Sequence, residues 1–201
     1  MPTVRAFLAR RLLVAVAVLV LAAAPHSAAA ASPSDDPSLP DLATFAGSVA
    51  NGEASVLRGV YVDGLFALRI VQQADDYFIS PRAGYATQFG AAKPYGVTGL
   101  LAHNFLSGQE FFKLRPGQHI ALIYGDGRSE TYAVSGVHRF QAMTPESQKS
   151  AFVDLGTGKR LDAQSVFNRF YTTSGRLVFQ TCIAADDELS WGRLFIVAEK
   201  Q

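Results

Sequence analysis

Short runs of alternating hydrophobic and polar residues dominate the chain after residue 55. This period of two predicts β-strands. The clearest unit is a hairpin, with strands over 119–124 and 130–141 on either side of a tight turn at Gly125-Asp126-Gly127. Further strands are expected within residues 56–73, which contain the turn pair Asp63-Gly64, and within 95–104, 177–183 and 193–198. Many short strands separated by turn residues indicate an all-β barrel or sandwich.

Helical patterns are short and few. The stretch "LATFAGSVANG", which begins at Leu42, fits a short helix ahead of the strands. Thr144 followed by Pro145 has the form of a helix N-cap and first helical residue, and predicts a helix over the residues that follow. The stretch "SVFNRFYTTSG", which begins at Ser165, predicts another short helix before a turn at Gly175.

The N-terminal residues have the pattern of an export signal. Three arginines within the first 11 residues precede the 13-residue apolar run "LLVAVAVLVLAAA", and small residues follow up to Ala31. An ordinary membrane span needs about 20 apolar residues, so residues 1–31 are predicted to be a cleaved signal peptide. An uncleaved anchor is the alternative. Either case predicts an exported protein, outside the cell or at the outer face of the cytoplasmic membrane.

A linker is expected after the signal peptide, over residues 32–46, because "SPSDDPSLPD" holds three prolines and three aspartates. Residues 47–201 then form one domain. Without residues 1–31, the 18 Lys and Arg residues fall by three to 15, against 17 Asp and Glu residues, so the net charge becomes about −2. This balance argues against nucleic acid as a partner.

The chain holds a single cysteine, Cys182, which follows the apolar run 177–181 and precedes the polar stretch "AADDELS". An unpaired cysteine is often an inert core residue. Exported proteins usually pair their cysteines, however, and a strand end at a barrel rim is accessible to substrates. A functional thiol and a structural one both remain open on this evidence.

A thiol nucleophile needs a base or a cation beside it. Of the four histidines, His26 lies in the signal peptide, His119 is expected to be solvated, and His138 is expected at the surface of an alternating strand. His103 ends an apolar strand and meets a polar turn, as Cys182 does. His103 is therefore the candidate base, with a structural, hydrogen-bonded histidine as the alternative.

Arg193 lies eleven residues after Cys182, at the start of the last predicted strand. If the two strands are antiparallel neighbours, both side chains reach the same rim. A guanidinium there can stabilise an oxyanion or hold a substrate carbonyl. The alternative is a rim arginine that pairs with the acidic run 186–188.

Three segments resemble the sortases, the cysteine transpeptidases of bacterial surfaces. They are "LVFQTC", which ends at the cysteine, "GLLAHNFLSGQEFFKLRPGQHIALIYGDGRSETYAVSGV", which contains the histidine strand and the next hairpin, and "WGRLFIVAEK", which contains the arginine. The order His, Cys, Arg is also similar. The resemblance covers residues 59–200.

The resemblance implies a sortase-like closed β-barrel with a few short helices. It also implies that Cys182 is the nucleophile, His103 the general acid or base, Arg193 the oxyanion and substrate clamp, and that Thr181 shapes the substrate groove. The expected substrate is a peptide or surface protein with a sorting signal. Its acyl group would pass through a thioester to an amine acceptor or water, close to the membrane. No cofactor or metal is expected.

The sequence departs from the family pattern in four places. Ala102 stands where glycine is usual, Gln118 stands where aspartate is typical, Phe179 stands where leucine is common, and an apparent insertion over 144–175 precedes the cysteine strand. The insertion is expected to form a wall of the groove, so the usual sorting motif does not carry over directly.

Two alternatives differ from a sortase-like enzyme. An L,D-transpeptidase resembles a pattern with arginine two residues after cysteine, but Ala184 occupies that position here. The other alternative is a non-catalytic peptide-binding protein on a sortase-like scaffold.

Overall fold

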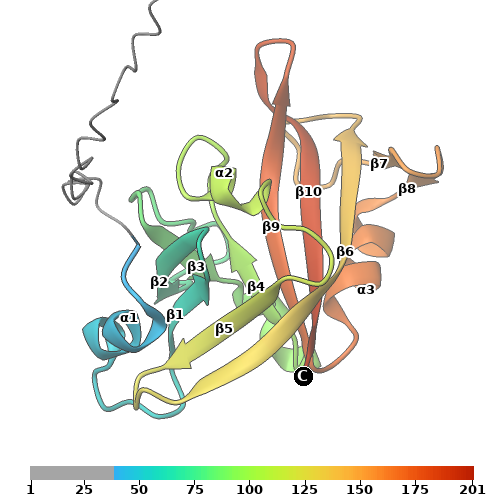
Figure 1. Ribbon diagram of the computed structural model, residues 1–201. Coiled ribbons are helices and arrows are strands. Elements are labelled where there is room, and N and C mark those ends of the chain that lie inside the picture. The colour runs from blue at the N-terminus through green and yellow to red at the C-terminus, as the bar shows by residue number, and fades with distance from the viewer. Residues whose placement is uncertain (1–38) are drawn as a thin grey trace, which may run out of the picture. The chain divides into compact units, whose positions relative to one another are not determined.

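The computed structural model describes residues 39–201 (Figure 1). The predicted signal peptide and residues 32–38 of the predicted linker lie outside the described residues. Residues 42–46, which the predicted linker includes, form the start of the first helix. The elements in chain order are α1 (Leu42–Val49), β1 (Leu57–Val62), β2 (Phe66–Gln72), β3 (Tyr85–Gln88), the 3₁₀ helix η1 (Gly90–Tyr95), β4 (Thr98–Leu101), α2 (Gly108–Phe111), β5 (His119–Tyr124), β6 (Ser129–Ala142), β7 (Phe152–Asp154), β8 (Arg160–Leu161), α3 (Ala163–Tyr171), β9 (Arg176–Ala185) and β10 (Glu188–Lys200).

Eight strands form a closed barrel. Their order around the ring is β10, β9, β4, β3, β2, β1, β5 and β6, and β6 pairs with β10 to close it. Neighbours are antiparallel except for the parallel pairs β2–β3 and β4–β9. Strands β7 and β8 extend from β6 outside the ring. The predicted all-β fold, a closed barrel with a few short helices, is confirmed.

The two predicted hairpins are present as β1–β2 and β5–β6. The predicted helix after Thr144 is absent, and that prediction was wrong. The segment forms consecutive turns, in which the N–H groups of Ser147 and Ser150 donate to Thr144 O and Ser147 O at 2.9 and 3.1 Å. Ser150 Oγ also accepts from Thr144 N at 3.0 Å. Serine hydroxyls that bond nearby backbone favour turns over helix.

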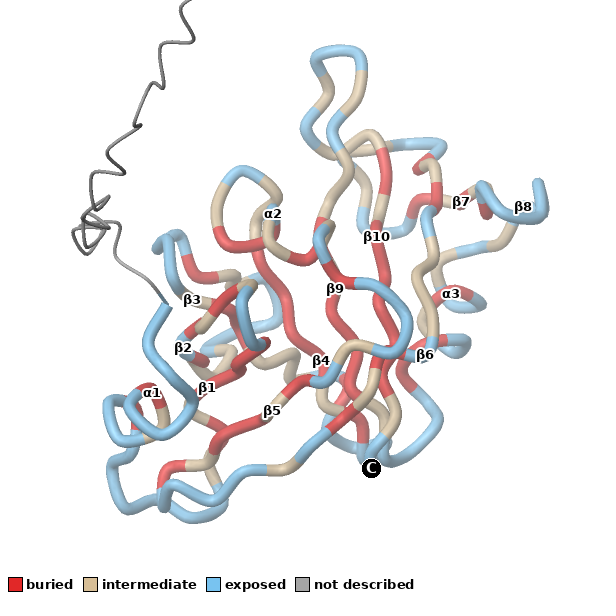
Figure 2. The backbone as a smooth tube through the Cα atoms, in the orientation of Figure 1, coloured by how far each residue is buried: buried red, intermediate tan, exposed pale blue. Residues whose placement is uncertain are grey.

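Strand β9 separates two hydrophobic cores through its alternating side chains. Leu177 and Phe179 belong to the barrel interior, whereas Val178 belongs to a second cluster outside the barrel. The second cluster fills the space between α3 and the outer face of β6, β9 and β10, and includes Phe170 and Phe195, whose rings stack at 4.2 Å. Both faces of β9 and β10 are therefore buried over much of their length (Figure 2).

Helix α1 packs on the barrel at β1 and β5. The carboxylate of Asp41 caps the helix by accepting from Thr44 N at 2.8 Å. Phe45 and Val49 bury their side chains against Tyr61 and Ile123. Within residues 39–201, no helix combines the length and the apolar character needed to cross a membrane.

Candidate active site

The strand pairing fixes Cys182 and Arg193 opposite each other. In the antiparallel β9–β10 ladder, Cys182 pairs with Arg193, and Gln180 pairs with Phe195. Directly opposed residues have Cβ atoms about 4.5–5.5 Å apart and project from the same face of the sheet. Cys182 and Arg193 therefore share the outer face of the barrel, at the end of β9 that precedes the β9–β10 turn.

His103 lies on the other side of β9. Strand β4 runs parallel to β9, and its last pair is Leu101 with Gln180. The two chains stay together beyond this pair, because Ala102 N donates to Gln180 O at 3.3 Å and Thr181 Oγ1 donates to Ala102 O at 2.8 Å. One residue further, the register brings His103 level with Cys182. The order across the three strands is thus histidine, cysteine, arginine.

A tight turn after β4 holds the backbone of His103. The carbonyl oxygen of His103 accepts from Leu106 N at 3.0 Å and from Gly108 N at 2.9 Å. Gly108 is needed here because a Cβ atom on it would lie only 2.7 Å from His103 O and would meet the hydroxyl of Thr181. The turn and the buried threonine therefore pack as one unit.

The side chains that follow His103 extend this support. The His103 ring stacks on the exposed ring of Phe105, with centroids 5.1 Å apart and planes tilted by 22°. Asn104 Nδ2 donates to Leu189 O of β10 at 2.9 Å, across 85 positions of sequence. The histidine turn is thereby tied to the first part of the strand that carries the arginine.

Backbone carbonyl groups hold the guanidinium of Arg193. Nη1 donates to Ser190 O and Gly192 O at 2.8 and 2.9 Å, and Nη2 donates to Pro145 O at 3.2 Å. Arginine has five N–H donors, so two remain for a ligand. Arg193 forms no ion pair with any residue in 39–201. It therefore does not pair with the acidic run 186–188, which was the alternative role.

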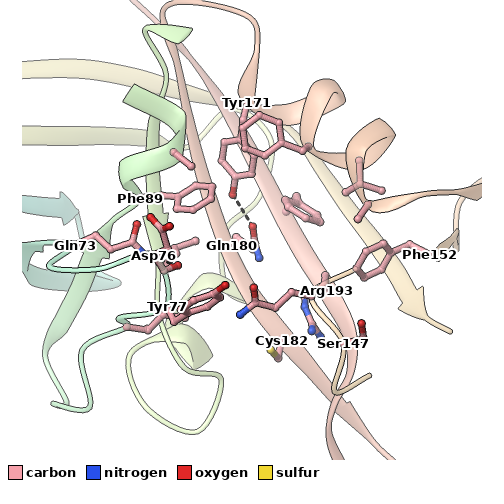
Figure 3. A pocket seen from close by; sticks show the side chains of 18 residues that line it. Gln73, Asp76, Tyr77, Phe89, Ser147, Phe152, Tyr171, Gln180, Cys182 and Arg193 are labelled. Atoms are coloured by element: carbon pink, nitrogen blue, oxygen red, sulfur yellow. Dashed lines mark hydrogen bonds between the residues drawn. The ribbon is translucent and has the colours of Figure 1, made fainter. Parts of the chain in front are cut away.

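A cavity of about 590 Å³ opens beside the cysteine and arginine (Figure 3). Cys182 and Arg193 lie at one end, and Tyr171 and Phe89 lie at the other. The apolar side chains that also form the wall are Ile79, Leu101, Phe152, Val166, Phe167 and Phe195. Three of the wall's elements come from the 144–175 insertion: the turn segment, β7 and α3. The insertion therefore lines this cavity. His103 is not among the lining residues.

Thr181 has a different place from the one expected. Its side chain is 3% exposed, lies on the inward face of β9, and is not among the lining residues. Its hydroxyl bonds the carbonyl of Ala102 instead. Thr181 therefore supports the histidine turn from the barrel interior instead of lining the cavity.

His119 is exposed, as expected, but His138 is half-buried. The His138 ring packs against Phe170 at 5.3 Å, and its Nδ1 lies 3.4 Å from a guanidinium nitrogen of Arg169. Burial, with a further contribution from the Arg169 charge, lowers the pKa of His138, and only Asp154 opposes this. The expected surface position was wrong because α3, whose docking site the alternation of β6 does not reveal, covers this strand.

Sequence reasoning missed Asn104, Phe105, Tyr171 and Gln180. Gln180 had a usable signal, because it lies two residues before Cys182 and therefore on the same strand face. The contacts of the other three depend on packing between distant segments. Within the described part of the chain, no cluster of three or more His, Cys, Asp or Glu residues has the arrangement of a metal site.

Solved structures similar to this chain include sortases. Sortase A from Listeria monocytogenes is 14% identical, with a TM-score of 0.46, and the match covers 73% of this chain and 88% of that one. Sortase E1 from Streptomyces coelicolor, with a tripeptide in its active site, is 15% identical, with a TM-score of 0.47 and coverage of 76% and 91%. Sortase C from Clostridium perfringens, with a C-terminal cell wall sorting motif, is 14% identical, with a TM-score of 0.45 and coverage of 80% and 83%.

No family model matches the chain, and no curated protein matches it by sequence. The three sortase matches have low sequence identity and TM-scores below 0.5.

Proposed function

We propose that this protein is an exported cysteine acyl-transfer enzyme, which cleaves a peptide through a Cys182 thioester and passes the acyl group to an amine or to water. The arrangement of His103, two residues after β4, beside Cys182 of β9, with Arg193 of β10 on the other side, supports the proposal most strongly. Cys182 is a free thiol, half-buried at the wall of the cavity. A strand pair that sets a cation opposite the thiol suits a nucleophile that reacts as a thiolate.

In the proposed reaction, the thiolate of Cys182 attacks the carbonyl carbon of the scissile peptide bond. The carbonyl oxygen becomes an oxyanion, to which Arg193 donates its remaining N–H groups. The C–N bond then breaks, and His103 gives a proton to the leaving amine. The thioester is resolved when an incoming amine or water attacks it, His103 takes up the proton, and Cys182 leaves as the thiolate.

The proposed substrate is a peptide or surface protein with a sorting signal. The sequence resemblance points to a Leu-Pro-x-Thr-Gly type, but the 144–175 insertion supplies much of the cavity wall, so the motif has to be determined on this chain.

Intact mass spectrometry after incubation with a mixed peptide pool tests the proposal. We expect a covalent adduct on Cys182 whose mass identifies the acyl segment and which hydroxylamine removes, as it removes thioesters. Cys182→Ala is the control and should carry no adduct. If no adduct forms, and a thiol reagent labels Cys182 no faster than it labels the unfolded chain, the non-catalytic peptide-binding alternative is favoured.

We also propose that residues 1–31 direct export and are then removed. The 13-residue apolar run followed by small residues motivates this proposal. N-terminal sequencing of the exported protein should begin near Ala31 or Ser32. Membrane-bound protein that still begins at Met1 would instead identify these residues as an anchor.

A further inference from the structure

Gln180 has a hydrogen-bonding arrangement that the catalytic proposal does not use. It lies in the cavity wall between Tyr171 and Cys182 (Figure 3). The hydroxyl of Tyr171 donates to Gln180 Oε1 at 2.7 Å. This bond uses the acceptor end of the amide and leaves its Nε2 end, with two N–H donors, toward the cavity. Within residues 39–201, Gln180 Nε2 donates no hydrogen bond, so both of its N–H groups are free for a ligand.

Tyr171 holds the amide rigidly because the tyrosine itself has little freedom. Its side chain is 2% exposed, and its ring packs against Phe89 at 5.1 Å and Phe167 at 5.4 Å. Tyr171 belongs to α3, so the insertion that covers the outer face of the barrel also orients a side chain of the cysteine strand.

The spacing between Gln180 and Cys182 matches that of an extended peptide. Two residues of a β-strand span about 6.6–6.8 Å, and both side chains lie on one face. Carbonyl groups two residues apart in an extended substrate have the same repeat and also point to one side. If the substrate runs along β9 with its N-terminal side toward Gln180, a scissile carbonyl that reaches Cys182 places the carbonyl two residues earlier beside Gln180.

From this match we infer that the Gln180 side-chain amide binds the carbonyl oxygen two residues before the scissile carbonyl of an extended peptide. The inference rests on the acyl-transfer function proposed above and adds a substrate-binding residue to it. The surrounding wall is largely apolar, including Phe89, Val166 and Phe195. A carbonyl that leaves water for such a wall needs a donor, because a buried unpaired acceptor is costly.

The contact is tested with two chloromethyl ketones, in which the thiolate of Cys182 displaces chloride. One probe is N-acetyl-tetraalanyl chloromethyl ketone, and the other has an ester in place of the amide between its second and third alanines. The ester carbonyl is the weaker acceptor and lies at the position assigned to Gln180. Alanine side chains are small, and irreversible alkylation gives a rate constant even for weak binding.

The quantity to compare is the ratio of the alkylation rate constants for the amide and ester probes, divided by the same ratio for the unfolded chain. For the folded parent, this ratio should be roughly ten. Gln180→Glu keeps an acceptor for Tyr171 but removes both donors, so this ratio should fall to about one. The double variant Gln180→Leu/Tyr171→Phe should behave alike without adding charge. Tyr171→Phe alone should give an intermediate ratio, because the amide is then free to rotate.

The matched control is Gln164→Leu, which makes the same change on the exposed face of α3, where Gln164 bonds only Asn168. It should keep the parental ratio. A parental ratio of one, or Gln180 variants that fold and keep the parental ratio, would overturn the inference. A different result would contradict the proposed function itself: the amide probe would alkylate Cys182 no faster in the folded protein than in the unfolded chain.

Discussion

The two faces of the β9–β10 pair differ in what they contribute. On the inner face, Leu177, Phe179, Leu194 and Ile196 are fully buried in the barrel interior. On the outer face, apolar residues such as Phe195 give way to polar ones toward the β9–β10 turn. The inner face therefore fixes the position of the strands, and the outer face carries the candidate chemistry.

The outer face differs because a separate segment covers only part of it. Phe170 of α3 stacks on Phe195, and this end of the face is as well packed as the interior. Beyond α3 the cavity begins, and Cys182 and Arg193 line it. Every second side chain of this rigid strand pair can therefore serve function. The residues between them, which face the barrel interior, need not change.

The largest expected effect of an outer-face change is that of Cys182→Ala. It removes the only thiol of the chain, so acyl-enzyme formation should fall to nothing. The fold should persist, because the half-buried side chain lies outside the barrel core. Intact mass spectrometry and a thermal melt check the two halves of this prediction. An unchanged rate of turnover would exclude Cys182 as the nucleophile.

An inner-face change should act on stability instead. Phe179 is 0% exposed and packs against Phe66 and Phe111, with ring centroids at 6.4 and 4.9 Å. Phe179→Ala should lower the free energy of unfolding by about 3–5 kcal/mol, measured by urea denaturation. Protein that remains folded should still be alkylated at Cys182. A loss of less than about 1 kcal/mol would contradict the assignment of Phe179 to a tightly packed core.

Arg193→Ala separates a catalytic role from a structural one on the outer face. If Arg193 stabilises the oxyanion, its loss should lower single-turnover acylation by roughly 10²–10³-fold. Arg193→Lys should not restore the rate fully, because an ammonium group lacks the planar fork of donors. Both variants should melt within a few degrees of the parent. Near-parental acylation with a clear loss of stability would mean that Arg193 only fastens the 144–150 segment through Pro145.

Local patterns were sufficient to predict an all-β barrel or sandwich, and the resemblance to sortases narrowed this to a closed barrel. Alternation and turn residues gave the β5–β6 hairpin almost to the residue, since β5 spans His119–Tyr124 as expected. Strand β4 is shorter than predicted, Thr98–Leu101 rather than 95–104. A 3₁₀ helix that contains Pro94 precedes it, and the His103 turn follows it.

The candidate site could be predicted only in part. Cys182, His103 and Arg193 each lie near the point where an apolar run meets polar residues, which is visible in a sequence. They are not strand ends in the structure, because β9 continues to Ala185, β10 already begins at Glu188, and β4 ends at Leu101, two residues before His103. The parallel pairing of β4 with β9, which brings His103 level with Cys182, joins residues 79 positions apart and has no local signal. The contacts of Asn104 with Leu189 and of Tyr171 with Gln180 depend on the same closure of the barrel and on the docking of α3.

The smallest expected effect concerns a charged cluster where α3 docks on the outer face. Arg169 of α3 donates to the Asp154 carboxylate at 2.7 Å and approaches His138 of β6 at 3.4 Å. Burial alone would raise the pKa of Asp154, but hydrogen bonds from Arg169 and Gly156 outweigh it, so the pKa lies below its usual value. The pKa of His138 is also lowered, first by burial and then by Arg169.

Both shifts make the protein less stable as the pH falls. The unfolded chain binds a proton at His138 near pH 6.5, whereas the folded protein takes it up only at lower pH, so stability declines below about pH 6.5. Asp154 contributes a second decline below its unfolded pKa near 3.9. The melting temperature should therefore be lower at pH 5.5 than at pH 7.5, and His138→Phe should reduce this difference. His119→Gln, at an exposed position, is the control and should retain it. Equal pH dependence in the parent and His138→Phe would show that His138 does not couple the docking of α3 to pH.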